Sequence, residues 1–182
     1  MKDRQLHIVH AGDHRGLVDA IRVIAQYQRN VQRLNVMRVS EAENATHLAE
    51  LLTEPAAVVL FSGHGTPDGW IGTEKDWLLD LKEVKAKARQ PFSAHGLIMD
   101  ACYGWNFRDA VSRQSSRPLA YLAACGVAPY TDTLLIVNVA ISLVGYWGKT
   151  LPKSAVDADD AFDQVLGSAR GLWHHDVLAA RP

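Results

Sequence analysis

Two short apolar runs that end in reactive side chains constrain this chain more than any other feature. The run at 57–61, Ala-Val-Val-Leu-Phe, leads into Ser-Gly-His-Gly at 62–65. The run at 97–99, Leu-Ile-Met, leads into Asp-Ala-Cys-Tyr-Gly at 100–104. Short apolar runs bounded by glycine are typical of buried parallel strands, in which both faces are covered. Because ligands gather at the carboxyl ends of such strands, these ends are the predicted site.

The two reactive side chains are His64 and Cys102. Neighbouring strands lie about 4.8 Å apart, so if the two runs pair side by side, an imidazole and a thiol share one crevice. That is the arrangement of a cysteine nucleophile and its base. The segment 80–90 has the composition of a crossover helix between the two strands. The alternative is a buried structural cysteine and a histidine in a turn.

A strand ending in His-Gly, a crossover and a strand ending in Asp-Ala-Cys-x-Gly resemble the caspase-haemoglobinase fold of cysteine peptidases. The caspase signature has Gln-Ala-Cys followed by Arg, Gln or Gly and then Gly. Here Asp100 stands where caspases have Gln, and Tyr103 follows the cysteine. An Asp two places before the cysteine is what metacaspases and paracaspases show. The resemblance therefore leans toward these, or toward bacterial caspase-like and CHAT-type domains.

The resemblance implies a role for each matching residue. Cys102 would be the nucleophile and His64 the base, and the N–H groups of Gly65 and Cys102 would form the oxyanion hole. In metacaspases and paracaspases the matching Asp helps to form an acidic S1 pocket, which implies Asp100 as a substrate-binding residue. The segment 17–20, Leu-Val-Asp-Ala, resembles the second acidic element of that pocket and adds Asp19. The expected activity is cleavage after Arg or Lys.

The order of patterns along the chain predicts an α/β fold of one domain spanning 1–182. Five strand-then-helix units favour a three-layer sandwich with a mostly parallel five- or six-stranded sheet in the order 2-1-3-4-5. A capping box at 40–43, Ser-Glu-Ala-Glu, predicts the start of a helix. No strand is predicted after Trp147, so we expect either a truncated sheet or an edge completed by a partner. His174 and His175 are expected in a solvated end of the chain.

Composition limits the other functions. The net charge is −1 without a long basic run, which argues against nucleic-acid binding. No apolar run reaches the 18 residues of a membrane span, and two cysteines indicate a reducing, cytoplasmic setting. His10, Asp13 and His14 are zinc-type ligands, but a polar loop explains them, so no metal is predicted. No cofactor is expected.

Three functions stay open at this point. The first is a cysteine endopeptidase that uses Cys102 and His64. The second is a catalytically inactive caspase-like module for protein recognition, and the third is an amidase or transpeptidase, whose thiolate chemistry is the same. The expected partners are a protein or peptide substrate and an activating or recruiting protein or a second copy of the chain, because an unrestrained peptidase needs control.

Overall fold

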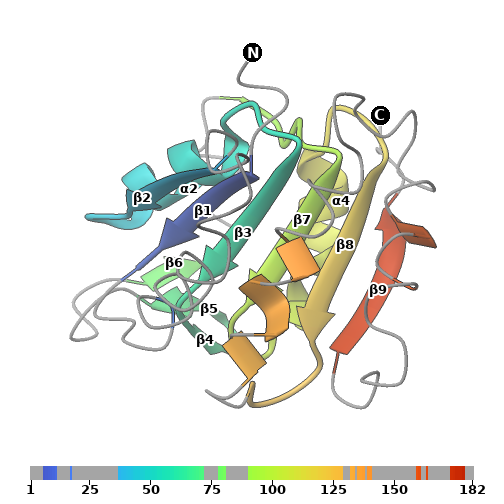
Figure 1. Ribbon diagram of the computed structural model, residues 1–182. Helices are drawn as coiled ribbons and strands as arrows, with labels where there is room; N and C mark the ends of the chain where they lie inside the picture. The colour runs from blue at the N-terminus through green and yellow to red at the C-terminus, as the bar shows by residue number, and fades with distance from the viewer. Residues whose placement is uncertain are drawn as a thin grey trace, which may run out of the picture.

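The computed structural model describes residues 6–11, 17, 37–71, 78–80, 90–128, 132–133, 135–137, 139–140, 159–160, 163 and 173–178. Its main feature is a six-stranded sheet in the order β2-β1-β3-β7-β8-β9 (Figure 1). The strands are β1 (Leu6–His10), β2 (Met37–Glu41), β3 (Val58–Ser62), β7 (Gly96–Asp100), β8 (Leu119–Ala124) and β9 (Trp173–Leu178). All neighbouring pairs are parallel except β8 with β9.

This topology confirms the predicted fold class and corrects one detail of it. The five parallel strands have the expected order, but the sheet does have a sixth strand after Trp147. His174 and His175, expected in a solvated end, lie in β9, which pairs along its whole length with β8. The sequence of β9, Trp-His-His-Asp-Val-Leu, does not read as a strand because three of its four middle residues are polar and only its two end residues are buried. The missing sixth strand is therefore no longer a reason to expect a partner, and the partner itself stays a prediction.

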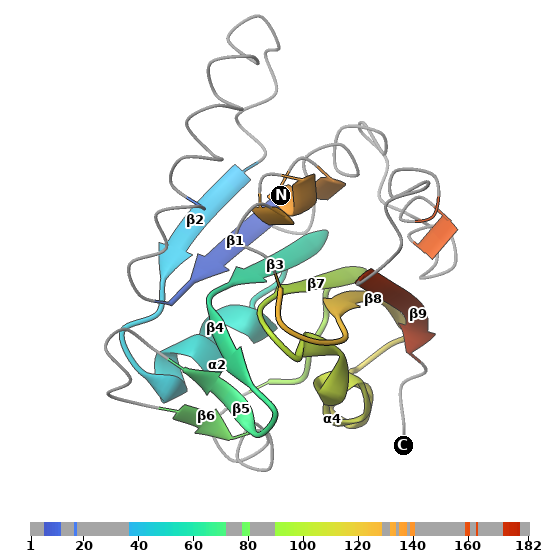
Figure 2. The same cartoon turned by 90° about the horizontal axis from the view of Figure 1, so that it is seen from below.

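The sheet is covered on both faces, which is why its central strands are apolar except for Ser62 and Asp100 at the ends of β3 and β7. Every residue of β3, β7 and β8 is buried. One core joins the sheet to α2 (Ala45–Thr53) and α4 (Arg108–Gln114), and a second core joins it to the helical residues 132–133, 135–137 and 139–140 (Figure 2). Among the described residues, no helix is long and apolar enough to cross a membrane.

A second, smaller sheet follows directly from β3. It consists of β4 (His64–Thr66), β5 (Gly69–Ile71) and β6 (Leu78–Asp80), all antiparallel. The hairpin of β4 and β5 is therefore part of a three-stranded unit. Trp70 anchors it, because its fully buried ring packs on Phe61 of β3 and edge-on against Phe107 at a centroid distance of 4.8 Å.

The capping box predicted at 40–43 is wrong. Ser40 lies inside β2, paired with Val9, and the N-cap of α2 is Asn44. The side-chain oxygen of Asn44 accepts the His47 N–H at 2.9 Å. Pairing of β2 with β1 continues to Glu41, so the chain is still extended where the pattern of side chains would begin a helix.

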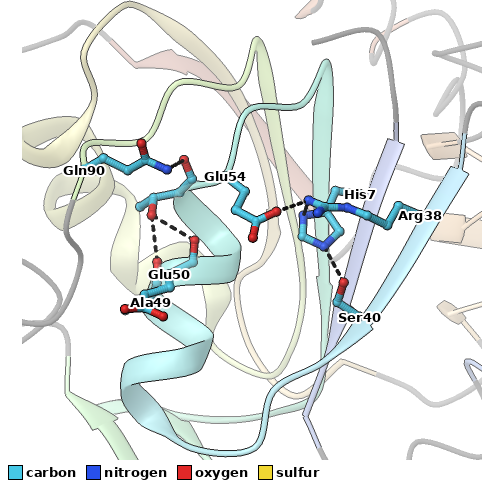
Figure 3. Close-up of polar contacts among 8 residues, drawn as sticks. His7, Arg38, Ser40, Ala49, Glu50, Glu54 and Gln90 are labelled. Carbon is cyan, nitrogen blue, oxygen red and sulfur yellow. Dashed lines mark hydrogen bonds and ion pairs between the residues drawn. The ribbon is translucent and has the colours of Figure 1, made fainter. Parts of the chain in front are cut away.

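A polar network on β1 and β2 explains what Ser40 does instead (Figure 3). His7 is only 1% exposed, and its Nδ1 accepts a hydrogen bond from Nη2 of Arg38 at 2.8 Å. Its Nε2 lies 2.9 Å from Oγ of Ser40. Arg38 also forms an ion pair with Glu54, the residue that ends α2. The network thus ties the edge strand to the sheet and to the helix below it.

The geometry fixes the tautomer of His7. A guanidinium can only donate, so Nδ1 is the acceptor and the proton resides on Nε2, which donates to Ser40. This arrangement excludes Ser40 and His7 as a nucleophile and base, because the imidazole has no lone pair facing the hydroxyl. Burial, and then the charge of Arg38, lower the pKa of His7 to about 4.

We expect His7 to make folding sensitive to acid. Between pH 6.5 and pH 4 its imidazole binds a proton in the unfolded chain but not in the folded one, so the contribution of His7 to the free energy of unfolding decreases by up to about 3 kcal/mol as the pH falls through this range. Urea unfolding of the wild type and His7→Gln across this range measures the contribution. His95→Gln, which removes a surface imidazole bonded to Arg117, is the control. Equal pH slopes in the wild type and His7→Gln would contradict this account.

Candidate active site

The carboxyl ends of β3 and β7 bring the predicted residues together. The strands are parallel neighbours, so both point toward the end of the sheet that carries β4 and β5 (Figure 1). His64, the first residue of β4, is exposed, and Cys102 is half-buried in the turn that follows β7. Each residue thus follows the end of its strand by two positions.

Gly65 makes direct backbone contact with the cysteine. A side chain at this position would place its Cβ 2.1 Å from the carbonyl oxygen of Cys102 and 3.1 Å from its backbone nitrogen. Only glycine therefore allows β4 to lie this close to the Cys102 peptide. In the structure, the space that a side chain at position 65 would fill is taken by the Cys102 peptide itself. The same contact places His64, the preceding residue, beside the cysteine turn.

The turn after Cys102 is strained at Tyr103. Its φ of 57° lies in the left-handed region, the only such non-glycine residue among those described. The Tyr103 N–H donates to the carbonyl of Gly126 at 2.7 Å, and the Gly104 N–H donates to Ala101 at 3.2 Å. Gly104 then begins the 3-10 helix η5 (Gly104–Phe107). Glycine is needed there because a Cβ would lie 3.0 Å from that of Met99 and 3.2 Å from that of Ala123.

Asp100 is buried rather than open to the crevice. It is 3% exposed, and its Oδ2 accepts a hydrogen bond of 2.8 Å from the hydroxyl of Ser62, which has no exposed surface. Burial raises the pKa of Asp100 to about 6, against the opposing effect of hydrogen bonds from Ser62 and Thr133. The negative charge of Asp132 raises this pKa further. Near neutral pH the pair Ser62 and Asp100 is therefore a hydroxyl bonded to a carboxylate.

Sequence reasoning missed these neighbours of Asp100. Ser62 belongs to the same Ser-Gly-His-Gly motif as His64, yet only its place at the strand end hinted at a role. The Oδ2 of Asp132 accepts the indole N–H of Trp173 in β9 at 2.9 Å. Thr133 follows it at the start of the helical residues. Contacts of this kind join segments that are far apart in the sequence, so no local pattern announces them.

The fold is similar to that of two solved structures of gingipain R. One is the Arg-specific cysteine proteinase gingipain R, with a TM-score of 0.59 at 11% identity, and the match covers 99% of this chain and 48% of that one. Another is the complex of the Porphyromonas gingivalis RgpB pro- and mature domains, with a TM-score of 0.54 at 10% identity over 99% and 49%. The fold is caspase-like.

This likeness concerns the fold, and the chain spans about half the length of the solved chains it matches. No family profile and no curated protein sequence matches it. The structural likeness to a cysteine proteinase thus supports the expected caspase-haemoglobinase architecture and a peptidase-like fold. The finer resemblance to metacaspases, paracaspases or CHAT-type domains stays a prediction.

The other candidate residues lie elsewhere in the caspase-like fold or outside the described residues. Asp19 falls outside them, as do Asp13 and His14 of the polar loop. The part of the chain that the structure describes contains no group of three or more side chains suited to a metal. Cys125 follows β8, and burial raises the pKa of its thiol. Its neighbour Gly126 accepts the hydrogen bond from Tyr103, so Cys125 borders the Cys102 turn.

The burial of Asp100 should make the free energy of unfolding depend on pH. Its carboxyl group binds a proton more tightly in the folded chain than in the unfolded one. Its contribution to the free energy of unfolding is therefore complete below pH 3.8 and is lost as the pH rises through 6. Asp100→Asn keeps an acceptor oxygen without the charge, so we expect it to raise the free energy of unfolding at pH 7 by up to about 3 kcal/mol. The gain should shrink toward pH 4.

Urea unfolding at pH 4 and pH 7 checks this expectation. Asp109→Asn is the control, because Asp109 is an exposed carboxylate in the first turn of α4. If Asp100→Asn costs more stability at pH 7 than at pH 4, burial is not what raises the pKa of Asp100.

Proposed function

We propose that this protein is a cysteine endopeptidase in which Cys102 and His64 form the catalytic dyad. The observation that carries the proposal is the backbone contact between Gly65 and Cys102, which puts the histidine segment against the cysteine turn. It occurs at the carboxyl ends of two adjacent parallel strands in a fold shared with a cysteine proteinase. A thiol and an imidazole at this edge are the parts that acyl transfer to a cysteine requires.

In the proposed reaction, the Cys102 thiolate attacks the carbonyl carbon of the scissile peptide. The N–H groups of Gly65 and Cys102 stabilise the negative oxygen that forms. The peptide C–N bond then breaks, and His64 gives its proton to the leaving amine. Water, deprotonated by His64, hydrolyses the thioester and restores the thiol. The close approach of Gly65 to Cys102 supports a role for both backbones in one oxyanion hole.

Digestion of a peptide library tests this assignment. We expect Cys102→Ala and His64→Ala each to lower kcat/KM by at least about a thousandfold, since the nucleophile and its base act as a unit. Cys125→Ser is the matched control, because it removes the other cysteine at a strand end and should leave cleavage nearly unchanged. Near-normal cleavage by His64→Ala would refute the dyad. If the wild type breaks the peptide bond but passes the acyl group to an added amine instead of to water, a transpeptidase is favoured.

We further propose that the enzyme cleaves after Arg or Lys. The carboxylate of Asp100, two residues before the nucleophile, and the nearby charge of Asp132 give this end of the sheet negative potential. A guanidinium or ammonium in the crevice would relieve the repulsion between the two carboxylates. Gingipain R, which has the same fold, is an Arg-specific proteinase. The part of Asp19 in such a pocket stays a prediction.

The pH dependence of cleavage tests the acidic pocket. Asp100 loses its proton near pH 6, so kcat/KM for peptides with Arg at P1 should rise through pH 6 about tenfold more than for matched peptides with Leu at P1. Asp100→Asn should remove this difference, while Asp109→Asn, on the exposed surface of α4, should keep it. Parallel pH profiles for the Arg and Leu peptides, or a preference for Asp at P1, would contradict the proposal.

A further inference from the structure

Ser62 and Asp100 form the last link between the two strands that carry the proposed dyad. The register of β3 with β7 begins at Val58 and Gly96 and ends with Ser62 opposite Asp100. Across this final pair the Ser62 hydroxyl donates to Oδ2 of Asp100 at 2.8 Å. The next N–H, that of Gly63, donates to the Asp100 carbonyl at 3.1 Å. The ends of the two strands are thus joined by a side-chain bond from Ser62 and a backbone bond from Gly63.

The position of this link relative to the dyad is symmetrical. His64 follows Ser62 by two residues, and Cys102 follows Asp100 by two residues. Beyond the link β4 pairs with β5 and the cysteine turn leads into η5, and the two segments meet again where Gly65 lies against the Cys102 peptide. A change in the lateral spacing of Ser62 and Asp100 would therefore shift the two segments that carry the imidazole and the thiol.

The chemistry of the link suits a rigid support. Ser62 has no exposed surface and Asp100 is 3% exposed, so water does not compete for the bond. A hydrogen bond to a carboxylate is about twice as strong as one between neutral groups. Thr133 donates to the same carboxylate from the helical residues on one face of the sheet. The Asp100 carboxylate thus accepts hydrogen bonds both from β3 and from the helical residues.

We propose that Ser62, through its hydrogen bond to Asp100, is a positioning residue that sets the spacing of His64 and Cys102. This inference rests on the proposed function and adds a residue to it. Ser62 touches neither the substrate nor the reacting atoms. Its effect is on how well the imidazole can deprotonate the thiol, and a displacement of about 1 Å in such a site costs up to a hundredfold in rate.

The reactivity of the Cys102 thiol measures this effect without any peptide substrate. The rate of alkylation by iodoacetamide is followed from pH 5 to pH 9, and mass spectrometry of the digested protein separates Cys102 from Cys125. In the wild type, His64 should raise the alkylation rate of Cys102 at pH 6 to 7 well above that in His64→Ala, because a neighbouring imidazole can accept the proton of the thiol and so generate the nucleophilic thiolate.

Ser62→Ala should then lose about tenfold of this His64-dependent rate, and its pH profile should move toward that of His64→Ala. Ser62→Thr keeps the hydroxyl and should restore the rate. Ser115→Ala is the matched control, because the Ser115 hydroxyl is also buried and donates at 2.8 Å, but to Val111 within α4. In peptide cleavage, Ser62→Ala should lower kcat about tenfold and change KM less than twofold.

The outcomes separate the two proposals. If Cys102 alkylates equally fast in the wild type and His64→Ala, the dyad fails and Ser62 has nothing to position. If the wild-type rate depends on His64 but Ser62→Ala matches the wild type, only the positioning role is overturned. A loss in Ser62→Ala that Ser62→Thr does not restore also overturns it. Ser62→Cys, of similar volume, replaces Ser62→Ala if the latter does not fold, with the same expected loss.

Discussion

The parallel pairing of β3 with β7 is the constraint on which the rest of the structure depends. All residues of both strands are buried, so their register is fixed by side chains that fit two cores at once. A slip of one residue would exchange the faces of every side chain in the strand. The same register ends with Ser62 opposite Asp100, and both chains leave the sheet at this point. The packing of the core therefore decides where an imidazole and a thiol can meet.

Two buried titratable groups have opposite effects on how the stability of this fold depends on pH. His7, on β1, is held neutral by burial and by the charge of Arg38, and its effect on stability grows as the pH rises from 4 to 6.5. Asp100, on β7, has its pKa raised by burial, and its effect on stability declines over nearly the same interval. Each is worth about 3 kcal/mol, so their sum changes little with pH. A nearly flat stability profile would hide two large contributions of opposite sign.

The parts of the fold that follow from local patterns could be predicted from the sequence. The strands β3, β7 and β8 are continuous apolar runs, and their order follows from repeated strand-then-helix units. The strand β9 has no such run, because it lies at the edge of the sheet and buries only its end residues, Trp173 and Leu178. The start of α2 was misplaced for a related reason: strand pairing through Glu41 overrides a side-chain pattern that would suit a helix.

The candidate site divides in the same way. The positions of His64 and Cys102 could be inferred because each follows a recognisable strand, and the structure brings their segments together through Gly65. The burial of Asp100 could not be inferred, since it depends on Ser62 from β3 and on Thr133 and Asp132 from a segment about 30 residues later. A carboxylate at a strand end looks the same in sequence whether it faces a crevice or lies beneath it.

The backbone around the two cysteines gives a physical reason to assign the proposed chemistry to Cys102. The left-handed conformation of Tyr103 costs on the order of 1 kcal/mol, and hydrogen bonds to Gly126 and from Asn106 hold it in place. Together with the contact of Gly65, these bonds grip the Cys102 turn from β4, from the loop after β8 and from η5. Burial raises the pKa of Cys125 instead, which disfavours its thiolate. A cysteine nucleophile needs a backbone that is held in place and a thiolate that forms readily. The geometry meets the first requirement at Cys102. The raised pKa of Cys125 argues against Cys125 on the second requirement.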